Sequence, residues 1–154
     1  MAEPRKFRCT ILAALMMAAE LIATHPAVAS SLPIEDRWLT DDRKAVVLIA
    51  SCGAALCGTI HQIRDKGPDV PKTDVYNPVP ALRSRSLIGL PILFGFRPNG
   101  GNWTNGHAYD PKSGKTYRAS LHLASHDQLV VTGCIFVFCQ SKYWTRLAPA
   151  DRER

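Results

Sequence analysis

The sequence has little that would build helices, and this shortage excludes a helical bundle. After Ala29, no window of about ten residues has apolar side chains at the spacing of an amphipathic helix. Instead, 11 Pro and 10 Gly are spread along the 154 residues, which favours turns and short strands. With 46% hydrophobic and 21% charged residues, the chain is neither disordered nor collagen-like, and its length suits one domain.

Motifs of enzymes and metal sites are also missing. The chain contains no Gly-x-Ser-x-Gly nucleophile elbow, and none of its histidines stands in a His-x-His or His-Glu-x-x-His pattern. Asp69 and Asp74 lack the carboxylate spacing of a calcium-binding EF-hand loop. We therefore expect neither an enzyme nor a cofactor or metal site.

Dense basic tracts are absent as well, although Lys and Arg outnumber Asp and Glu by 19 to 13. Nucleic-acid-binding proteins usually cluster their basic residues, so we expect no nucleic-acid partner. The excess of positive charge is compatible with weak attraction to anionic surfaces of a cell envelope.

The N-terminal residues 1–29 have the three parts of a secretory signal peptide. A basic stretch at residues 5–8 precedes an apolar run, Thr10–Ala23, which Glu20 interrupts. Ala27-Val28-Ala29 then supplies the small side chains that signal peptidase requires.

This pattern predicts cleavage after Ala29 and export to the periplasm or the medium of a bacterium. Residues 30–154 would form a single mature domain that does not span a membrane. The alternative is an uncleaved membrane anchor, which is disfavoured because the apolar run is shorter than the ~20 residues that cross a bilayer.

Cleavage would remove Cys9 and leave two matched pairs, CGAALC (Cys52 and Cys57) and CIFVFC (Cys134 and Cys139). Zinc is the alternative, but the spacers are apolar and an oxidising compartment favours disulfides. Four cysteines allow three pairings. The cysteines of each local pair flank a hairpin connection, so proximity favours a disulfide within each pair. A long-range bridge such as Cys52–Cys139 would stabilise the fold by ~4.6 kcal/mol, against ~2 kcal/mol for a local bridge.

Strand patterns fill most of the mature chain. Between Lys115 and Leu123, apolar residues alternate with polar ones, as in a half-buried antiparallel strand. Further strands are predicted at Trp38–Thr40, Lys44–Ala50, Leu56–Ile63, Leu87–Phe94, Trp103–Tyr109, Gln128–Gly133 and Ser141–Leu147. Regularly spaced short strands with polar turns predict an all-β barrel or sandwich.

Residues 64–86 interrupt this rhythm with a proline-rich segment that can supply few ladder hydrogen bonds. The pattern Asp74-x-x-Asn77-Pro78 within it indicates an Asx-type turn. Such a long irregular loop is either functional or a structural strap over one end of the domain.

Four phrases occur in order within residues 38–147: AVVLIASCGAALCGTI, DVYNPVPALRSRSLIGLPIL, YDPKSGKTY and YWTR. Together they resemble a bacterial exported family known as a domain of unknown function, number twenty-one forty-seven. One departure is Asp36-Arg37 before Trp38, because the family often has Gly before this Trp. The resemblance implies a small antiparallel, lipocalin-like (calycin-type) β-barrel of about eight strands, and it implies no established activity.

Lipocalin-like barrels often pack a Trp of the first strand against an Arg of the last. The resemblance therefore implies that Trp38 and Arg146 meet and close the barrel floor, where an Arg over a Trp face contributes ~0.5–2 kcal/mol.

Two functions fit such a barrel. In the first, the interior binds a small, partly apolar ligand. The candidate contacts are Arg83, Arg85, Tyr109 and Tyr117 as polar groups, with Phe94, Phe96 and Trp103 as apolar wall. In the second, a filled barrel is an envelope interaction or structural module that uses the loop 64–86 or an exposed sheet face. An apolar cavity would favour ligand binding. A packed interior beside an exposed apolar patch would favour the interaction or structural module. Ligand, partner and oligomeric state are left open.

Replacing Trp38 tests the predicted closure. We expect Trp38→Ala to lower the free energy of unfolding by ~3–5 kcal/mol, as truncation of a large buried aromatic residue does. Denaturant melts measure this change, and a loss below ~1 kcal/mol would instead identify Trp38 as a surface residue.

Overall fold

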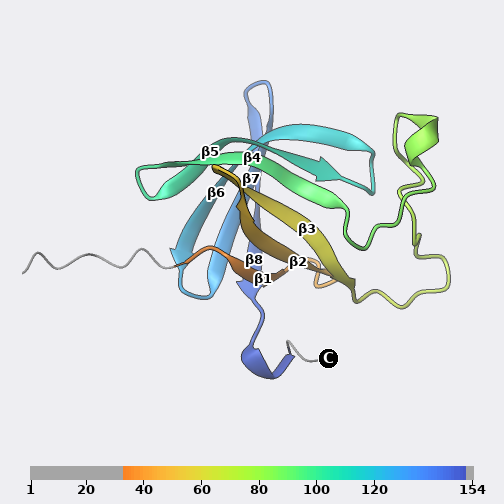
Figure 1. Cartoon of the computed structure of the whole chain (residues 1–154), viewed down its shortest axis with the longest axis horizontal. Coiled ribbons are helices and arrows are strands. Elements are labelled where there is room, and N and C mark those ends of the chain that lie inside the picture. The colour runs from red at the N-terminus through yellow and green to blue at the C-terminus, as the bar shows by residue number, and fades with distance from the viewer. Residues whose placement is uncertain (1–32, 152–154) are drawn as a thin grey trace, which may run out of the picture.

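The structure is a computed structural model that describes residues 33–151, in which eight strands form one closed antiparallel barrel (Figure 1). The strands are β1 (Asp36–Leu39), β2 (Ala45–Cys52), β3 (Ala55–Ile63), β4 (Pro91–Asn99), β5 (Asn102–Asp110), β6 (Lys115–Ser125), β7 (Gln128–Ile135) and β8 (Phe138–Arg146). Each strand pairs with the next along the chain, and β8 returns to pair with β1. Two short 3-10 helices, η1 (Pro80–Leu82) and η2 (Pro149–Asp151), lie outside the barrel ladder. The predicted signal peptide and its cleavage site fall outside the described residues.

The antiparallel barrel of about eight strands expected from the sequence is confirmed. The alternation predicted for β6 is also present, because Ala119 and Leu121 are buried, Ser120 between them is only half-buried, and Arg118 and His122 on either side are exposed. Most buried side chains gather in one core inside the barrel, in which Phe96 is completely inaccessible to solvent, and Leu39, Val46 and Leu147 form a second, small cluster.

Several strand ends differ from the sequence prediction. Strand β4 begins at Pro91 and not at Leu87, because Leu87–Leu90 form a turn in which the Leu90 N–H donates to the Leu87 carbonyl. Strands β7 and β8 continue past their cysteines, so that Ile135 and Phe138 pair across a two-residue turn. The turn needs only two residues because Phe136, its first, adopts a left-handed conformation with φ 53°.

Trp38 and Arg146 lie at the seam where β1 meets β8. They are register partners, and the guanidinium carbon of Arg146 lies 4.4 Å from the centroid of the Trp38 ring. Trp38 is completely buried, and its indole N–H donates to the Ile34 carbonyl at 2.9 Å. The pair is thus a cation–π contact inside the closed end of the barrel.

Arg146 also satisfies all sides of its guanidinium group. It donates to the carbonyls of His126 (2.6 Å) and Pro33 (3.0 Å) and to the Asp36 carboxylate (2.8 Å). These partners come from the turn between β6 and β7 and from the segment entering β1. One buried side chain therefore joins three parts of the chain at this end.

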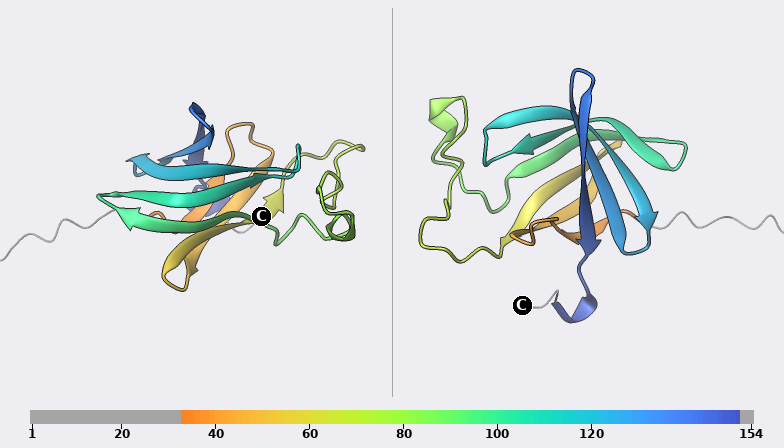
Figure 2. Two further views of the ribbon diagram at one scale, coloured as in Figure 1. Left: turned by 90° about the horizontal axis from the view of Figure 1, so that it is seen from above. Right: turned by 180° about the vertical axis from the view of Figure 1, so that it is seen from behind.

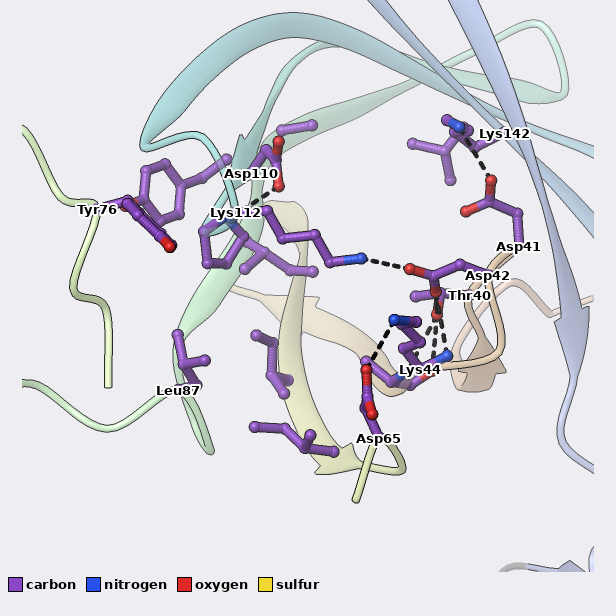
Figure 3. Close-up of a pocket in the computed structure, with 18 of the residues that line it drawn as sticks. Thr40, Asp41, Asp42, Lys44, Asp65, Tyr76, Leu87, Asp110, Lys112 and Lys142 are labelled. Atoms are coloured by element: carbon purple, nitrogen blue, oxygen red, sulfur yellow. Dashed lines mark hydrogen bonds and ion pairs between the residues drawn. The ribbon is translucent and has the colours of Figure 1, made fainter. Parts of the chain in front are cut away.

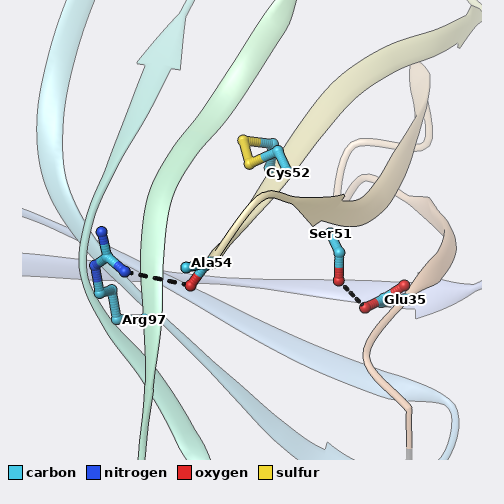
Figure 4. Close-up of a disulfide and its surroundings, with 6 residues drawn as sticks. Glu35, Ser51, Cys52, Ala54 and Arg97 are labelled. Atoms are coloured by element: carbon cyan, nitrogen blue, oxygen red, sulfur yellow. Dashed lines mark hydrogen bonds between the residues drawn. A yellow bond between two sulfur atoms is a disulfide. The ribbon is translucent and has the colours of Figure 1, made fainter.

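Both disulfides are local and lie in hairpins. Cys52 is bonded to Cys57 at the β2–β3 turn, and Cys134 to Cys139 at the β7–β8 turn. This is the pairing favoured by proximity in the sequence. Figure 4 shows the first bridge, with the Arg97 side chain donating to the Ala54 carbonyl of the same turn.

The connections alternate between the two ends of the barrel, as an antiparallel order requires. The closed end carries the β2–β3, β4–β5 and β6–β7 turns together with the Arg146 network. The opposite end carries the β1–β2 turn, the long β3–β4 loop, the β5–β6 turn and the β7–β8 hairpin. In Figures 1 and 2 the β3–β4 loop stands well away from the sheet on one side.

We expect Arg146→Leu to destabilise the protein by ~3–5 kcal/mol, because it removes the guanidinium donors from the half-buried Asp36 carboxylate and from two carbonyls. Arg146→Lys should recover only part of this loss, because an ammonium group cannot reproduce the planar arrangement of donors by which the guanidinium group reaches its three acceptors. Equal stability of Leu and Lys variants in denaturant melts would show that packing of the stem, and not the hydrogen bonds, matters.

Candidate functional site

A cavity of about 1140 Å³ enters the barrel at the end opposite the Arg146 network. Its deep wall is apolar and is supplied by β3, β4, β5, β7 and β8. The wall residues are Ile60, Ile63, Ile92, Leu93, Ala108, Val131 and Trp144. Tyr117 and Gln140 contribute polar groups to the same lining.

Three ion pairs surround the entrance of the cavity (Figure 3). Asp42 pairs with Lys112, and Asp41 pairs with Lys142 at 3.1 Å. These contacts connect the β1–β2 turn to the β5–β6 turn and to β8. The third pair joins Lys44 to Asp65 at 2.8 Å.

The ion pairs are partly exposed, so they contribute little to stability. Burial tends to raise the pKa of Asp42, but hydrogen bonds from Lys112, Thr40 and the Lys44 backbone outweigh it and lower this pKa to about 2. Hydrogen bonding to Asp65 raises the pKa of Lys44. The rim therefore remains charged at neutral pH and surrounds an apolar interior.

The proline-rich loop forms part of the entrance. Residues 67–71, Thr73, Tyr76 and Leu87 line the cavity. The loop folds back on itself, because Thr73 bridges to Ser86 and the Leu87 N–H donates to the Lys72 carbonyl. It is thus both an ordered strap and a wall of the cavity.

A buried polar cluster fastens this loop to β5. Asp74 is completely buried, and its carboxylate accepts hydrogen bonds from the Tyr109 hydroxyl (2.6 Å) and the Asn77 amide (2.7 Å). Arg85 completes the cluster with an ion pair to Asp74 at 2.7 Å and lies 5.7 Å from the Tyr109 ring centroid. Several donors converge on one carboxylate, which makes its burial tolerable.

The cluster shifts two pKa values in opposite directions. Burial alone would raise the pKa of Asp74, but the hydrogen bonds from Tyr109, Asn77 and Arg85 outweigh it and lower this pKa. Burial and the hydrogen bond to Asp74 raise the pKa of Tyr109. The carboxylate and the neutral phenol are therefore the stable pair between acid and strongly alkaline pH.

A tight backbone contact holds the same loop from another side. Gly114, in the β5–β6 turn, has φ 67°, and a Cβ atom placed on it would lie 2.0 Å from the Tyr76 carbonyl oxygen. Only glycine fits there, because the neighbour is backbone. The phrases DVYNPVP (residues 74–80) and YDPKSGK (residues 109–115), which have 28 residues between them in the chain, thus meet at the cavity entrance.

The structure separates the candidate ligand contacts that the sequence suggested. Tyr117 and Tyr109 line the cavity, although the Tyr109 hydroxyl is engaged by the Asp74 cluster. Arg85 belongs to that cluster, and Arg83 donates to the Asn77 carbonyl.

The aromatic candidates take other places. Phe94 stacks on His107, with ring centroids 5.6 Å apart, and does not line the main cavity. Phe96 and Trp103 pack in or against the core. The wall is formed instead mostly by aliphatic residues and Trp144.

Sequence reasoning missed the role of Asp74. The expected Asx turn occurs at Asn77, whose side chain accepts from the Val79 N–H at 2.9 Å, while the Asp74 carboxylate faces Tyr109. Nothing local marks this contact, because Tyr109 is 35 positions away in the chain. The rim ion pairs were missed for the same reason.

Among residues 33–151, no group of three potential metal ligands lies close enough to hold an ion. No helix in this range has the length and apolarity needed to cross a bilayer.

A closed eight-stranded antiparallel barrel with an apolar cavity open at one end and an Arg–Trp seam at the other is a lipocalin-like barrel. The chain belongs to the bacterial family described as "Uncharacterized protein conserved in bacteria (DUF2147)", whose family model matches residues 36–146. This confirms the family that the sequence phrases indicated.

A solved structure supports the fold. Protein HP1028 from the human pathogen Helicobacter pylori, described as belonging to the lipocalin family, superposes with a TM-score of 0.71 and 22% sequence identity. The match covers 79% of this chain and 88% of that one. No curated protein matches the sequence.

We expect acid to release the loop through Asp74. Because its pKa is lower in the folded state than the ordinary ~3.9, its contribution to docking is present above that value and fades as the pH falls through the folded-state pKa. Asp74→Asn should raise hydrogen exchange of residues 73–87 about tenfold or more at neutral pH, since unpaired buried donors cost ~1–3 kcal/mol.

The matched control is Asp69→Asn, which changes an exposed carboxyl in the same loop. It should leave exchange unchanged at neutral pH. Wild-type exchange that is insensitive to acid, after correction for the intrinsic rate, would show that Asp74 does not hold the loop.

Proposed function

We propose that this protein is exported by bacteria to the periplasm or the medium and binds a small, partly apolar ligand in its barrel cavity. The observation that carries the proposal is the cavity of about 1140 Å³ with an apolar wall and a charged rim. Ligand sites are typically concave, mostly apolar and supplied with a few polar groups.

The geometry favours a ligand with an apolar body and a polar end. The interior offers aliphatic contacts from Ile60, Leu93 and Val131, with Tyr117 as a hydrogen-bonding group. The entrance offers Lys112 and Lys142, each held by an aspartate that a ligand could replace. An apolar body would enter the barrel while the polar end stays among the rim charges.

We further propose that the protein binds without catalysing a reaction. The most strongly buried polar groups beside the cavity, Asp74, Asn77 and Tyr109, are engaged with one another. Such mutual engagement suits a structural fastening better than proton transfer to a ligand.

Filling the cavity tests the proposal. Gly133 lines the cavity on β7, and a Cβ atom placed there would lie 3.5 Å from the Tyr117 Cβ, an ordinary contact. Gly133→Leu should therefore fold and occupy ligand space. With anilinonaphthalene sulfonate as the probe, we expect its affinity, measured by dye fluorescence, to fall tenfold or more, ~1.4 kcal/mol.

The control is Thr132→Leu on the same strand. The Thr132 hydroxyl of the wild type bonds the exposed Ser141 hydroxyl outside the barrel, so this substitution does not enter the cavity. It should bind the dye as the wild type does. In native mass spectrometry, protein recovered from its own envelope should retain a small molecule that Gly133→Leu lacks. Equal dye binding by all three proteins, with no retained molecule, would contradict the proposal.

Export has its own test. We expect the full-length chain, expressed in a bacterium, to appear in the periplasmic or culture fraction with Ser30 as its first residue, as intact mass measures. A protein retaining residues 1–29, or one with four titratable thiols after recovery, would contradict export through a cleaved signal peptide.

A further inference from the structure

The β7–β8 hairpin ends in an apolar tip made of Ile135, Phe136, Val137 and Phe138. Their exposed fractions are 49%, 87%, 85% and 81%, which are high for large apolar side chains. Figures 1 and 2 show this hairpin, in blue, projecting beyond the neighbouring strands. A protruding apolar tip of this kind marks an interaction surface.

The turn itself does not explain these residues. Phe136 has φ 53°, a conformation that glycine adopts without cost and that bulky residues avoid. The other disulfide hairpin of the chain provides the comparison, because its two-residue turn has Gly53 at the corresponding position with φ 67°. The β7–β8 turn thus carries an unfavourable aromatic residue at the outermost point, held by the Cys134–Cys139 bridge.

The strands that carry the tip have one sign of charge. Strands β6, β7 and β8 contain no Asp or Glu, while Lys115, Arg118 and Lys142 are exposed on them. Arg118 is the register partner of Cys134, so it lies next to the bridge beneath the tip. Lys142 has an aspartate partner, Asp41, from the β1–β2 turn. Arg118, exposed next to the bridge, therefore places a positive charge beside the tip that attracts anions, while the aspartates of the rim lie on the cavity side of the hairpin with their lysine partners.

The size of the tip decides which partner it fits. Four such side chains offer on the order of 600 Å² at most, with ~150–250 Å² for each aromatic residue, below the ~800 Å² that each partner buries in a stable protein interface. A lipid surface needs no such area, because it accepts apolar side chains between headgroups and attracts nearby cations.

We propose that the CIFVFC hairpin inserts its tip into phospholipid bilayers that carry anionic headgroups, with Arg118 beside it at the headgroup level. Ile135 and Phe138 also line the cavity, so this docking would bring the cavity entrance to the bilayer surface. The proposal does not depend on ligand binding, because vesicle association is measured without a ligand.

The test uses the protein recovered after expression of the full-length chain, with the N-terminus of every variant verified by intact mass. Sedimentation measures binding to vesicles of phosphatidylcholine alone and of phosphatidylcholine with phosphatidylglycerol. Phe136→Gly combined with Val137→Ser removes the two outermost of the four tip side chains while giving the turn its preferred residue type, so this variant should fold at least as well as the wild type.

We expect the wild type to bind the anionic vesicles and the tip variant to bind at least tenfold more weakly. Arg118→Gln should weaken binding to anionic vesicles and make it less sensitive to salt. The matched control combines Val79→Ser with Ile88→Ser, because both side chains are 50% exposed on the β3–β4 loop. It should bind as the wild type does.

Several results would overturn the proposal. These are wild-type protein that does not sediment with anionic vesicles, a tip variant that binds like the wild type, and equal binding to the neutral vesicles. Dye binding in the cavity should persist in the tip variant, so a failure of vesicle binding is distinguishable from a failure of the proposed function.

Discussion

Closure of the barrel depends on the contact between Arg146 and Trp38. Strand β1 has only four residues and meets β8 at two register pairs, so the backbone ladder at this seam is short. The seam is completed by the guanidinium group over the indole ring and by its bonds to Asp36 and to two carbonyls. If β1 and β8 separated here, the sheet would have two open edges, which expose unpaired backbone groups.

The two ends of the barrel are built by different means. The closed end uses short turns and one buried arginine, which packs over the completely buried Trp38. The open end uses a long loop that bonds to the sheet only near its ends and adds no strand to the barrel, because its prolines supply few N–H donors. Side chains replace the missing ladder, and the Asp74 cluster and the Tyr76–Gly114 contact hold the loop beside the entrance.

Placing these polar contacts at the margins keeps the cavity wall apolar. Asp74 receives donors from Tyr109, Asn77 and Arg85, so its charge is satisfied where the loop meets β5. The rim aspartates are satisfied by lysines at the entrance. Because buried polar groups find partners within these clusters, the interior wall can remain aliphatic without unsatisfied groups. A wall of this kind suits an apolar ligand body.

The two disulfide hairpins share one local motif but differ in the residues that form their turns. Both bridges close tight turns, and in each turn the first residue is left-handed. In the β2–β3 hairpin, glycine and alanine make a small turn near the closed end. In the β7–β8 hairpin, large apolar residues occupy the turn beside the entrance. The bridge there holds a turn whose large apolar side chains are exposed.

The sequence alone placed the eight strands to within a few residues, because period-two alternation and turn residues are local properties, and its four phrases indicated the family and through it the antiparallel barrel. Tyr117 was also named from the sequence among the cavity-lining residues, but Phe94 and Phe96 were assigned to a wall that other residues form. Only the tertiary structure decided the partners of Asp74, the rim pairs and the existence of the cavity. These depend on how strands distant in the chain curve around a common axis, and no local pattern records which side chains then face one another.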